Sequence, residues 1–201
     1  MPTWSVERKE FIRICQKALR MNMQVSTGGN LSMKLDENLL LVKPSGCSLY
    51  DLHEEALLVT DGAGRLIEGT GKPTKEINTH LSVYRVRKDA GGVVHYHCPY
   101  ATAYAVSQKP LPLMTVHARR ILGKVPLIPP GAEGSPELAL NVEKIFSDAS
   151  VCAALLAGHG IMTCGKTLAG AQNMAELVEE SARIALLSRM LSQGHHCVPE
   201  Q

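Results

Sequence analysis

Two histidines separated by one residue, His95 and His97, follow an apolar run in the segment Gly-Gly-Val-Val-His-Tyr-His. Residues two apart on a strand project from the same face of a sheet, so both imidazoles can reach one metal ion. Alone, such a pair is weak evidence, because two histidines on one strand face are more often ordinary surface or core residues. Other parts of the sequence have to decide between these interpretations.

Two further candidate ligands stand at comparable places. His159 follows a second apolar run, 151–157, and Glu76 stands where a helix is expected to begin. Strand ends and helix starts are the usual location of sites in α/β proteins. Three neutral imidazoles with one carboxylate suit a borderline divalent ion, Zn²⁺ first, with Mn²⁺, Co²⁺ or Fe²⁺ as alternatives, and leave a position open for substrate. The pattern indicates a catalytic metal site.

A glycine-rich segment, Ser-Thr-Gly-Gly-Asn at 26–30, is the second sign of chemistry. Glycines let backbone amides turn toward a ligand, and hydroxyl and amide side chains add neutral donors, so such a segment can hold a phosphate. Taken alone, it is more often a tight turn. The short polar segments 43–46 (Lys-Pro-Ser-Gly) and 74–75 (Thr-Lys) are similar. Three of them in a chain with a metal site favour phosphate binding.

The elements expected to position these residues alternate between helices and strands. Apolar spacing and capping residues predict helices over 5–21, 76–87, 99–107, 135–146 and 167–191. Strands are expected over 31–34, 39–43, 56–60, 65–68, 91–94, 125–128 and 151–157. The last helix is apolar or small on more than one face, so it needs cover on both sides, which a subunit interface would supply. No linker or repeat interrupts the chain, so residues 1–201 are expected to form a single domain.

Composition excludes several classes of protein. A hydrophobic share of 45% supplies a core, while a net charge of +2 and few aromatic residues argue against a nucleic-acid partner. No apolar stretch approaches the roughly 20 residues that span a bilayer, and no signal-peptide region is recognised. We therefore expect a cytoplasmic protein without a membrane partner. Its six cysteines form no C-x-x-C pair and are expected to be reduced thiols.

Six groups of residues together resemble the class II aldolase and adducin-head family, which includes fuculose-phosphate aldolase, rhamnulose-phosphate aldolase and ribulose-phosphate 4-epimerase. They occur in the family's order and run over nearly the whole chain. The matching segments are Thr27 to Ser32, Lys43 to Gly46, Pro73 to Glu76 with His80, Tyr84-Arg85, Val93 to His97 with Pro99 to Ala103, and Leu155 to Gly160.

The resemblance implies a three-layer α/β/α sandwich around a mostly antiparallel central sheet, assembled as a homotetramer with active sites at subunit interfaces. It also implies that His95, His97 and His159 are the zinc ligands. Glu76 would bind the metal and then act as the catalytic base, with His80 expected to be a hydrogen-bonded supporting residue. The substrate phosphate would lie near Thr27, Gly29, Asn30, Ser45, Gly46, Thr74 and Lys75.

The implied reaction is that of a sugar-phosphate aldolase. Such an enzyme cleaves a carbon–carbon bond of a small phosphorylated keto-sugar through a zinc-stabilised enediolate, and it releases dihydroxyacetone phosphate and an aldehyde. Substrate selection is expected from the loop 113–123 and from the C-terminal tail, which contains His195, His196 and Cys197. That loop also holds His117 and Arg119, the candidates for an acid contributed across an interface.

One departure from the aldolase pattern leaves an alternative open. The aldolases carry two small hydroxyl residues before the glutamate, whereas this chain has Thr74-Lys75. The Lys-Glu pair is similar to that of 3-oxo-tetronate 4-phosphate decarboxylases, whose substrate also carries a carboxylate. An epimerase is less expected, because those members have aspartate at the position of Glu76 and a C-terminal tyrosine, and no tyrosine follows Tyr104 here. A non-catalytic adducin-like module has no need of a complete ligand set.

Overall fold

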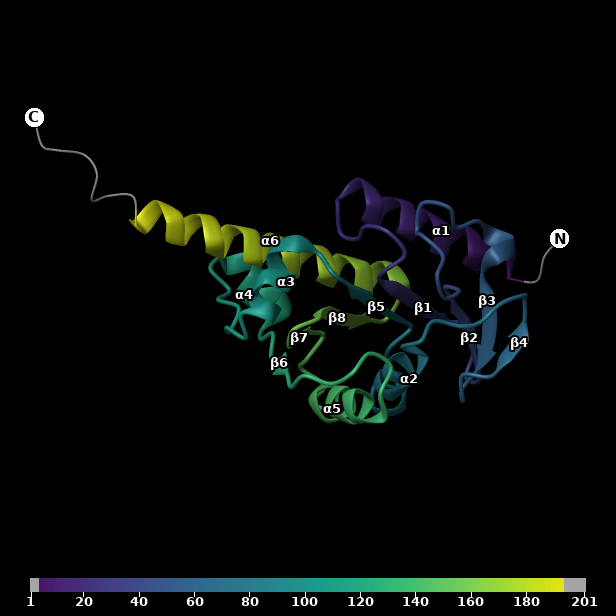
Figure 1. Ribbon diagram of the computed structural model, residues 1–201. Helices are drawn as coiled ribbons and strands as arrows, with labels where there is room; N and C mark the ends of the chain where they lie inside the picture. Colours follow the sequence, from purple (N-terminus) through teal and green to yellow (C-terminus); the bar gives the residue numbers. More distant parts are fainter. Residues whose placement is uncertain (1–3, 194–201) are drawn as a thin grey trace, which may run out of the picture.

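The computed structural model describes residues 4–193, which form a central sheet between two layers of helices (Figure 1). The strands are β1 Asn30–Lys34, β2 Leu39–Val42, β3 Leu58–Asp61, β4 Leu66–Glu68, β5 Gly92–Tyr96, β6 Leu127–Ile128, β7 Ala153–Leu156 and β8 Gly160–Gly165. They lie in the order β4-β3-β2-β1-β5-β8-β7-β6. Neighbouring strands are antiparallel except β6 and β7. The predicted mostly antiparallel sheet is confirmed.

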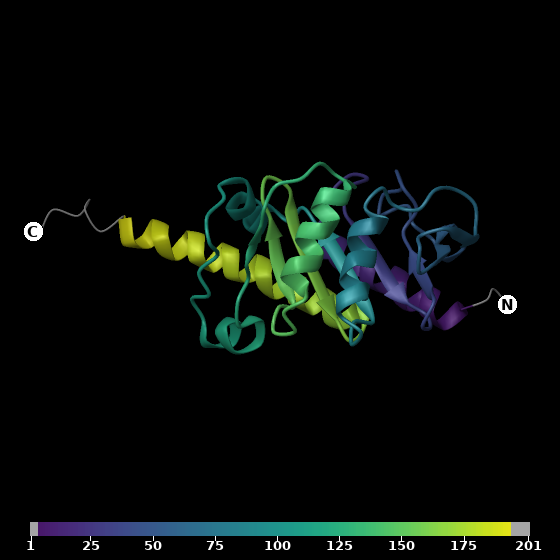
Figure 2. The same cartoon turned by 90° about the horizontal axis from the view of Figure 1, so that it is seen from below.

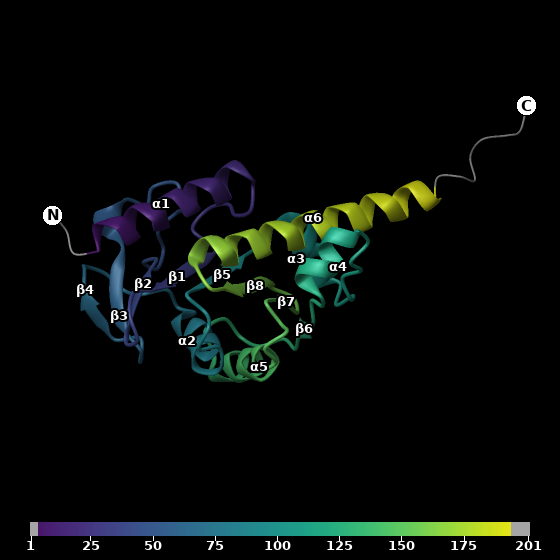
Figure 3. The same cartoon turned by 180° about the vertical axis from the view of Figure 1, so that it is seen from behind.

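Helices cover both faces of this sheet. They are α1 Ser5–Arg20, α2 Ile77–Val86, α3 Pro99–Val106, α4 Val116–Leu122, α5 Pro136–Phe146 and α6 Leu168–Gln193, with a short 3₁₀ helix at Glu54–Ala56. In Figures 1 and 3, α1, α3, α4 and α6 lie on one side of the sheet. The view from below shows α2 and α5 side by side on the other face (Figure 2). The predicted three-layer α/β/α sandwich is confirmed.

Of three apolar clusters within residues 4–193, the two largest account for most of the packing between the layers. The larger one joins α1, α3, α4 and α6 to one face of the sheet, and its members include Phe11, Leu31 and Val94. The second joins α2 and α5 to the opposite face and includes Phe146. Because both faces are covered, the central strands are buried throughout.

The predicted elements fall close to the observed ones, with two omissions. Strand β8 was not predicted from the sequence, because its neighbouring residues Ile161 and Met162 point to opposite faces and both are buried, so no polar alternation marks it. The segment expected to be a loop over 113–123 contains helix α4. Thr115 caps that helix, since its Oγ1 accepts a hydrogen bond from Ala118 N at 3.1 Å.

Among residues 4–193, no helix combines the length and the apolar character needed to cross a membrane.

Candidate metal centre and active site

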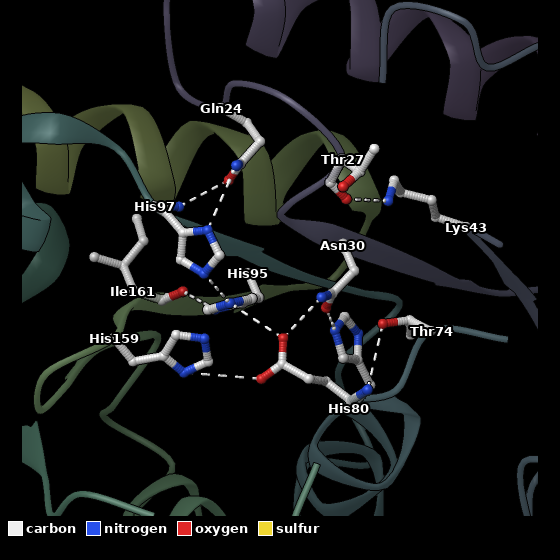
Figure 4. A network of polar contacts seen from close by, with 11 residues as sticks. Gln24, Thr27, Asn30, Lys43, Thr74, His80, His95, His97, His159 and Ile161 are labelled. Atoms are coloured by element: carbon white, nitrogen blue, oxygen red, sulfur yellow. Dashed lines mark hydrogen bonds and ion pairs between the residues drawn. The ribbon is translucent and has the colours of Figure 1, made fainter. Parts of the chain in front are cut away.

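The register of the sheet brings segments distant in sequence to one end of the fold. Asn30 on β1 pairs with His95 on β5, and His97 follows the end of β5. His159 lies in the tight turn that joins β7 to β8 beside the same strand end. Glu76 immediately precedes α2 and occupies its N-cap. The three predicted histidine ligands and Glu76 therefore come together (Figure 4).

The ligand atoms lie within reach of a single ion. One nitrogen from each of the three histidines lies within 4.8 Å of the others, and Nε2 of His95 is 3.0 Å from Nε2 of His97. Glu76 Oε2 lies 3.2 Å from His95 Nε2, and Oε1 lies 3.9 Å from Nδ1 of His159. Four donors of these types suit a divalent transition metal.

The surroundings favour the neutral imidazole at His95 and His97. Burial lowers the pKa of His95 well below its ordinary value, and the other two histidines lower it further. Burial and His159 lower the pKa of His97 in the same way. Nδ1 of His95 donates a hydrogen bond to the backbone oxygen of Ile161 at 2.8 Å, so Nε2 keeps its lone pair. A neutral, oriented imidazole is the form that binds a metal.

The environment of the Glu76 carboxylate shows whether the site suits a cation. Its side chain is 1% exposed, and Oε2 accepts a hydrogen bond from Nδ2 of Asn30 at 2.8 Å. Oε1 is buried without a hydrogen-bond partner. An unpartnered buried carboxylate oxygen is costly, and an ion between this oxygen and the three imidazoles would neutralise it. The residues therefore fit a divalent metal.

A buried chain of hydrogen bonds leads from Asn30, the partner of Glu76, to His80 and Ser32 and holds Glu76 in place. His80 Nε2 lies 2.5 Å from Oδ1 of Asn30, and its Nδ1 lies 2.7 Å from Oγ of Ser32. The hydroxyl of Tyr84 donates to the backbone oxygen of Ser32 at 3.0 Å. The amide oxygen of Asn30 can only accept, so His80 carries its proton on Nε2. As expected, His80 is hydrogen-bonded and supports a neighbour of the metal site.

We expect His80 to make the metal-free protein acid-sensitive. Burial lowers the pKa of His80 to about 3, whereas a histidine in the unfolded chain has a pKa near 6.5. Between these values the unfolded state binds the additional proton, so stability rises with pH. This residue alone should lower the free energy of unfolding by about 2 kcal/mol between pH 7 and pH 5.

Urea unfolding of the metal-free protein at a series of pH values measures this effect. His80→Gln should flatten the dependence between pH 5 and pH 7, even if it lowers stability at every pH. His53→Gln is the matched control, because His53 is exposed. Equal pH dependence in the wild type and His80→Gln would contradict the expectation.

A cavity of about 230 Å³ opens beside Glu76 and His97. Every residue predicted for the phosphate lines it: Thr27, Gly29, Asn30, Ser45, Gly46, Thr74 and Lys75. Gly29 has a φ of +64°, and a Cβ there would lie 2.5 Å from Oε1 of Gln24. Only glycine therefore fits without displacing Gln24.

Three residues of the site were not assigned from the sequence. Lys43, 2% exposed, lines the cavity and donates to the backbone oxygen of Thr27 at 3.1 Å, and burial lowers its pKa. Glu133, from the loop before α5, also lines the cavity. Oε1 of Gln24 accepts a hydrogen bond from the backbone nitrogen of His97 at 2.9 Å. Lys43 belongs to the segment 43–46, which the sequence already indicated for phosphate binding. No local sequence pattern marks Glu133 or Gln24.

Comparison with known proteins agrees with this architecture. A family model described as "Class II Aldolase and Adducin N-terminal domain" matches residues 9–186. An L-fuculose phosphate aldolase of Methanococcus vannielii is 39% identical over 179 residues, which cover 89% of this chain and 95% of that protein. A 3-oxo-tetronate 4-phosphate decarboxylase of Pectobacterium atrosepticum is 34% identical over 186 residues, which cover 90% of this chain and 84% of that protein.

Two solved structures have the same fold as this chain. An L-fuculose 1-phosphate aldolase superposes with a TM-score of 0.86 at 32% identity, covering 93% of this chain and 88% of that one. The L-fuculose-1-phosphate aldolase of Thermus thermophilus gives a TM-score of 0.83 at 26% identity, covering 96% of this chain and 98% of that chain. The chain belongs to the class II aldolase and adducin N-terminal domain family.

Proposed function

We propose that this chain is a metal-dependent lyase that cleaves a carbon–carbon bond of a small phosphorylated keto-sugar and releases dihydroxyacetone phosphate and an aldehyde. The observation that carries the proposal is the buried, half-partnered carboxylate of Glu76 beside three converging imidazoles at the end of a polar cavity. Relatives named as L-fuculose phosphate aldolases support it. A non-catalytic module has no need of such a group.

His95, His97 and His159 would hold the ion. When bound, a divalent ion supplies Lewis-acid stabilisation of negative charge on substrate oxygens. Glu76 moves a proton to or from the substrate carbon, because it lines the cavity and Asn30 fixes the orientation of its carboxylate through the 2.8 Å hydrogen bond. Glu76 is 1% exposed and Asn30 is 6% exposed, so little bulk water reaches this carboxylate.

Apart from the carboxylate of Glu133, the rest of the cavity suits a phosphate. The hydroxyls of Thr27, Ser45 and Thr74 provide neutral donors, and the ammonium groups of Lys43 and Lys75 provide positive charge. A phosphate held there keeps the reacting carbon near Glu76, since one cavity contains both sets of residues.

The position of Lys75 favours a second candidate function, decarboxylation of a 3-oxo-tetronate 4-phosphate. Its exposed side chain stands directly before Glu76 at the cavity, where an ammonium group can bind a substrate carboxylate. Relatives named as 3-oxo-tetronate 4-phosphate decarboxylases support this candidate. No comparable observation supports an epimerase or an adducin-like module.

The deciding experiment supplies zinc-loaded protein with short ketose 1-phosphates and with a 3-oxo-tetronate 4-phosphate. Dihydroxyacetone phosphate is followed with and without a chelator. We expect chelator-sensitive product with an aldehyde from the first set. Product with carbon dioxide from the second substrate would make the protein a decarboxylase, and no product from either would contradict the proposed lyase.

Replacing Lys75 tests what its charge binds. We expect Lys75→Met to raise KM for the phosphorylated substrate about 10- to 100-fold, because a charged hydrogen bond is lost. If the lysine binds phosphate, KM rises for both substrate classes, whereas a carboxylate partner would confine the rise to the 3-oxo acid. Lys72→Met is the matched control, since Lys72 is exposed and lies outside the cavity lining. An unchanged KM for both substrates would contradict a binding role.

Four features stay predictions from the sequence: the single domain over residues 1–201, the cytoplasmic location, the absence of nucleic-acid and membrane partners, and the homotetramer with active sites at its interfaces. Exposed apolar side chains near the end of α6 support a subunit interface there. They include Leu187 at 46%, Met190 at 59% and Leu191 at 73% exposure.

A further inference from the structure

Two cysteines stand opposite each other at one end of strands β7 and β8. Ala153 pairs with Thr163, so the antiparallel ladder places Cys152 opposite Cys164, and the backbone nitrogen of Cys164 donates to the oxygen of Cys152 at 2.9 Å. Residues opposed in this way share one face of the sheet, with Cα atoms about 5.5 Å apart. That separation lies within the range of about 4.4 to 6.8 Å that a disulfide spans.

A fixed positive charge lies beside one of the two thiols. Nη2 of Arg87 is 4.0 Å from Sγ of Cys152. The guanidinium is held by two hydrogen bonds of 2.9 Å to the carboxylate of Asp89 and by one from Nη1 to the backbone oxygen of Val151. With its side chain 6% exposed, Arg87 has little freedom to turn away. A guanidinium in this position stabilises a thiolate.

The two thiols differ in reactivity and access. A hydrogen bond from Cys164 and the charge of Arg87 lower the pKa of Cys152 below its ordinary value. The same hydrogen bond and burial raise the pKa of Cys164. Cys152 is half-buried, whereas Cys164 lies in the apolar cluster under α2 and α5. An accessible thiolate with a protonated thiol directly behind it is the arrangement of an attacking and a resolving cysteine.

We propose that Cys152 and Cys164 form a thiol pair that a hydroperoxide oxidises to a disulfide. The Cys152 thiolate attacks one peroxide oxygen, the O–O bond breaks, and protonation of the departing oxygen gives water or an alcohol. The Cys164 sulfur then attacks the Cys152 sulfenic acid, its S–O bond breaks, and water leaves as the disulfide forms. Two thiols lose two electrons and two protons, and the peroxide gains them.

This pair is separate from the proposed lyase site. Cys152 and Cys164 lie at the far end of β7 and β8 from the turn that carries His159, and neither lines the cavity beside Glu76. Oxidation can therefore be measured without any assay of turnover, and its result does not depend on the proposed function.

Peroxide treatment of the full chain tests the pair directly. We expect digestion and mass spectrometry to find a peptide linked through Cys152 and Cys164. In Cys164→Ser, dimedone should label the sulfenic acid on Cys152. Cys47 is the internal control, because its thiol is also half-buried and its Sγ donates to the backbone oxygen of Ser48. Oxidation of Cys47 without a Cys152–Cys164 link would overturn the proposal.

Alkylation rates test the source of the reactivity. Iodoacetamide should modify Cys152 at least about tenfold faster than Cys47 at pH 7, because the pKa of Cys152 is lowered. Arg87→Gln should slow modification of Cys152 about tenfold at pH 7, and Arg87→Lys should retain more of the wild-type rate. The wild-type comparison needs neither variant to fold. Equal rates at Cys152 and Cys47 would overturn the assignment of Cys152 as the attacking thiol.

Discussion

Glu76→Gln is expected to lower turnover about 10²- to 10⁴-fold while the protein keeps its metal. The range is the usual contribution of a positioned acid or base. Glutamine has the same length and its amide oxygen still accepts the hydrogen bond from Asn30, so the site keeps its shape. An amide cannot take up the proton that a carboxylate transfers. The three imidazoles remain to hold the ion.

Metal content and turnover are measured on the same zinc-loaded sample. The matched control is Glu137→Gln, because Glu137 is exposed in the first turn of α5 and lies outside the cavity lining. It should retain wild-type turnover. Unchanged turnover of Glu76→Gln would contradict its role in proton transfer. Loss of zinc from that variant would instead show that the carboxylate is an essential ligand.

The sequence predicted the elements whose residues carry a local pattern. Helix α1 was predicted to within a residue, because Phe11, Ile14 and Ala18 recur at helical spacing and are buried on one face. Strand β8 shows the opposite case. Its residues are buried on both faces by α6 on one side and α5 on the other, so the signal of alternation is absent.

The same contrast holds at the site. Residue type and spacing suffice to select His95 and His97 as candidate ligands, since chemistry and strand period act within three residues. Gln24 touches His97 from 73 residues away, and only the folded sheet brings the two together. Glu133 enters the cavity from a loop whose path is set by packing, as Gly134 lies against the backbone of Lys75. Contacts of this kind leave no local signature in the chain.

His95→Ala is expected to remove the metal and the activity together. The imidazole is fully buried, its Nε2 lies 3.0 Å from His97 Nε2 and 3.2 Å from Glu76, and its Nδ1 is fixed by Ile161. Loss of a residue that only orients a ligand typically weakens metal binding about 10- to 100-fold, so loss of the ligand itself should exceed about 100-fold. Titration against a chromophoric chelator measures this affinity.

Chelation of the wild type should reproduce the His95→Ala result, because both leave Glu76 and the cavity in place and remove the ion. Turnover should fall to background and return when Zn²⁺ is restored to the wild type, whereas His95→Ala should stay inactive at the same zinc concentration. His53→Ala is the control, since this exposed histidine lies outside the site and should leave affinity and turnover unchanged. Full turnover by the chelated wild type would exclude the metal from the reaction. Full zinc affinity in His95→Ala would remove His95 from the ligand set.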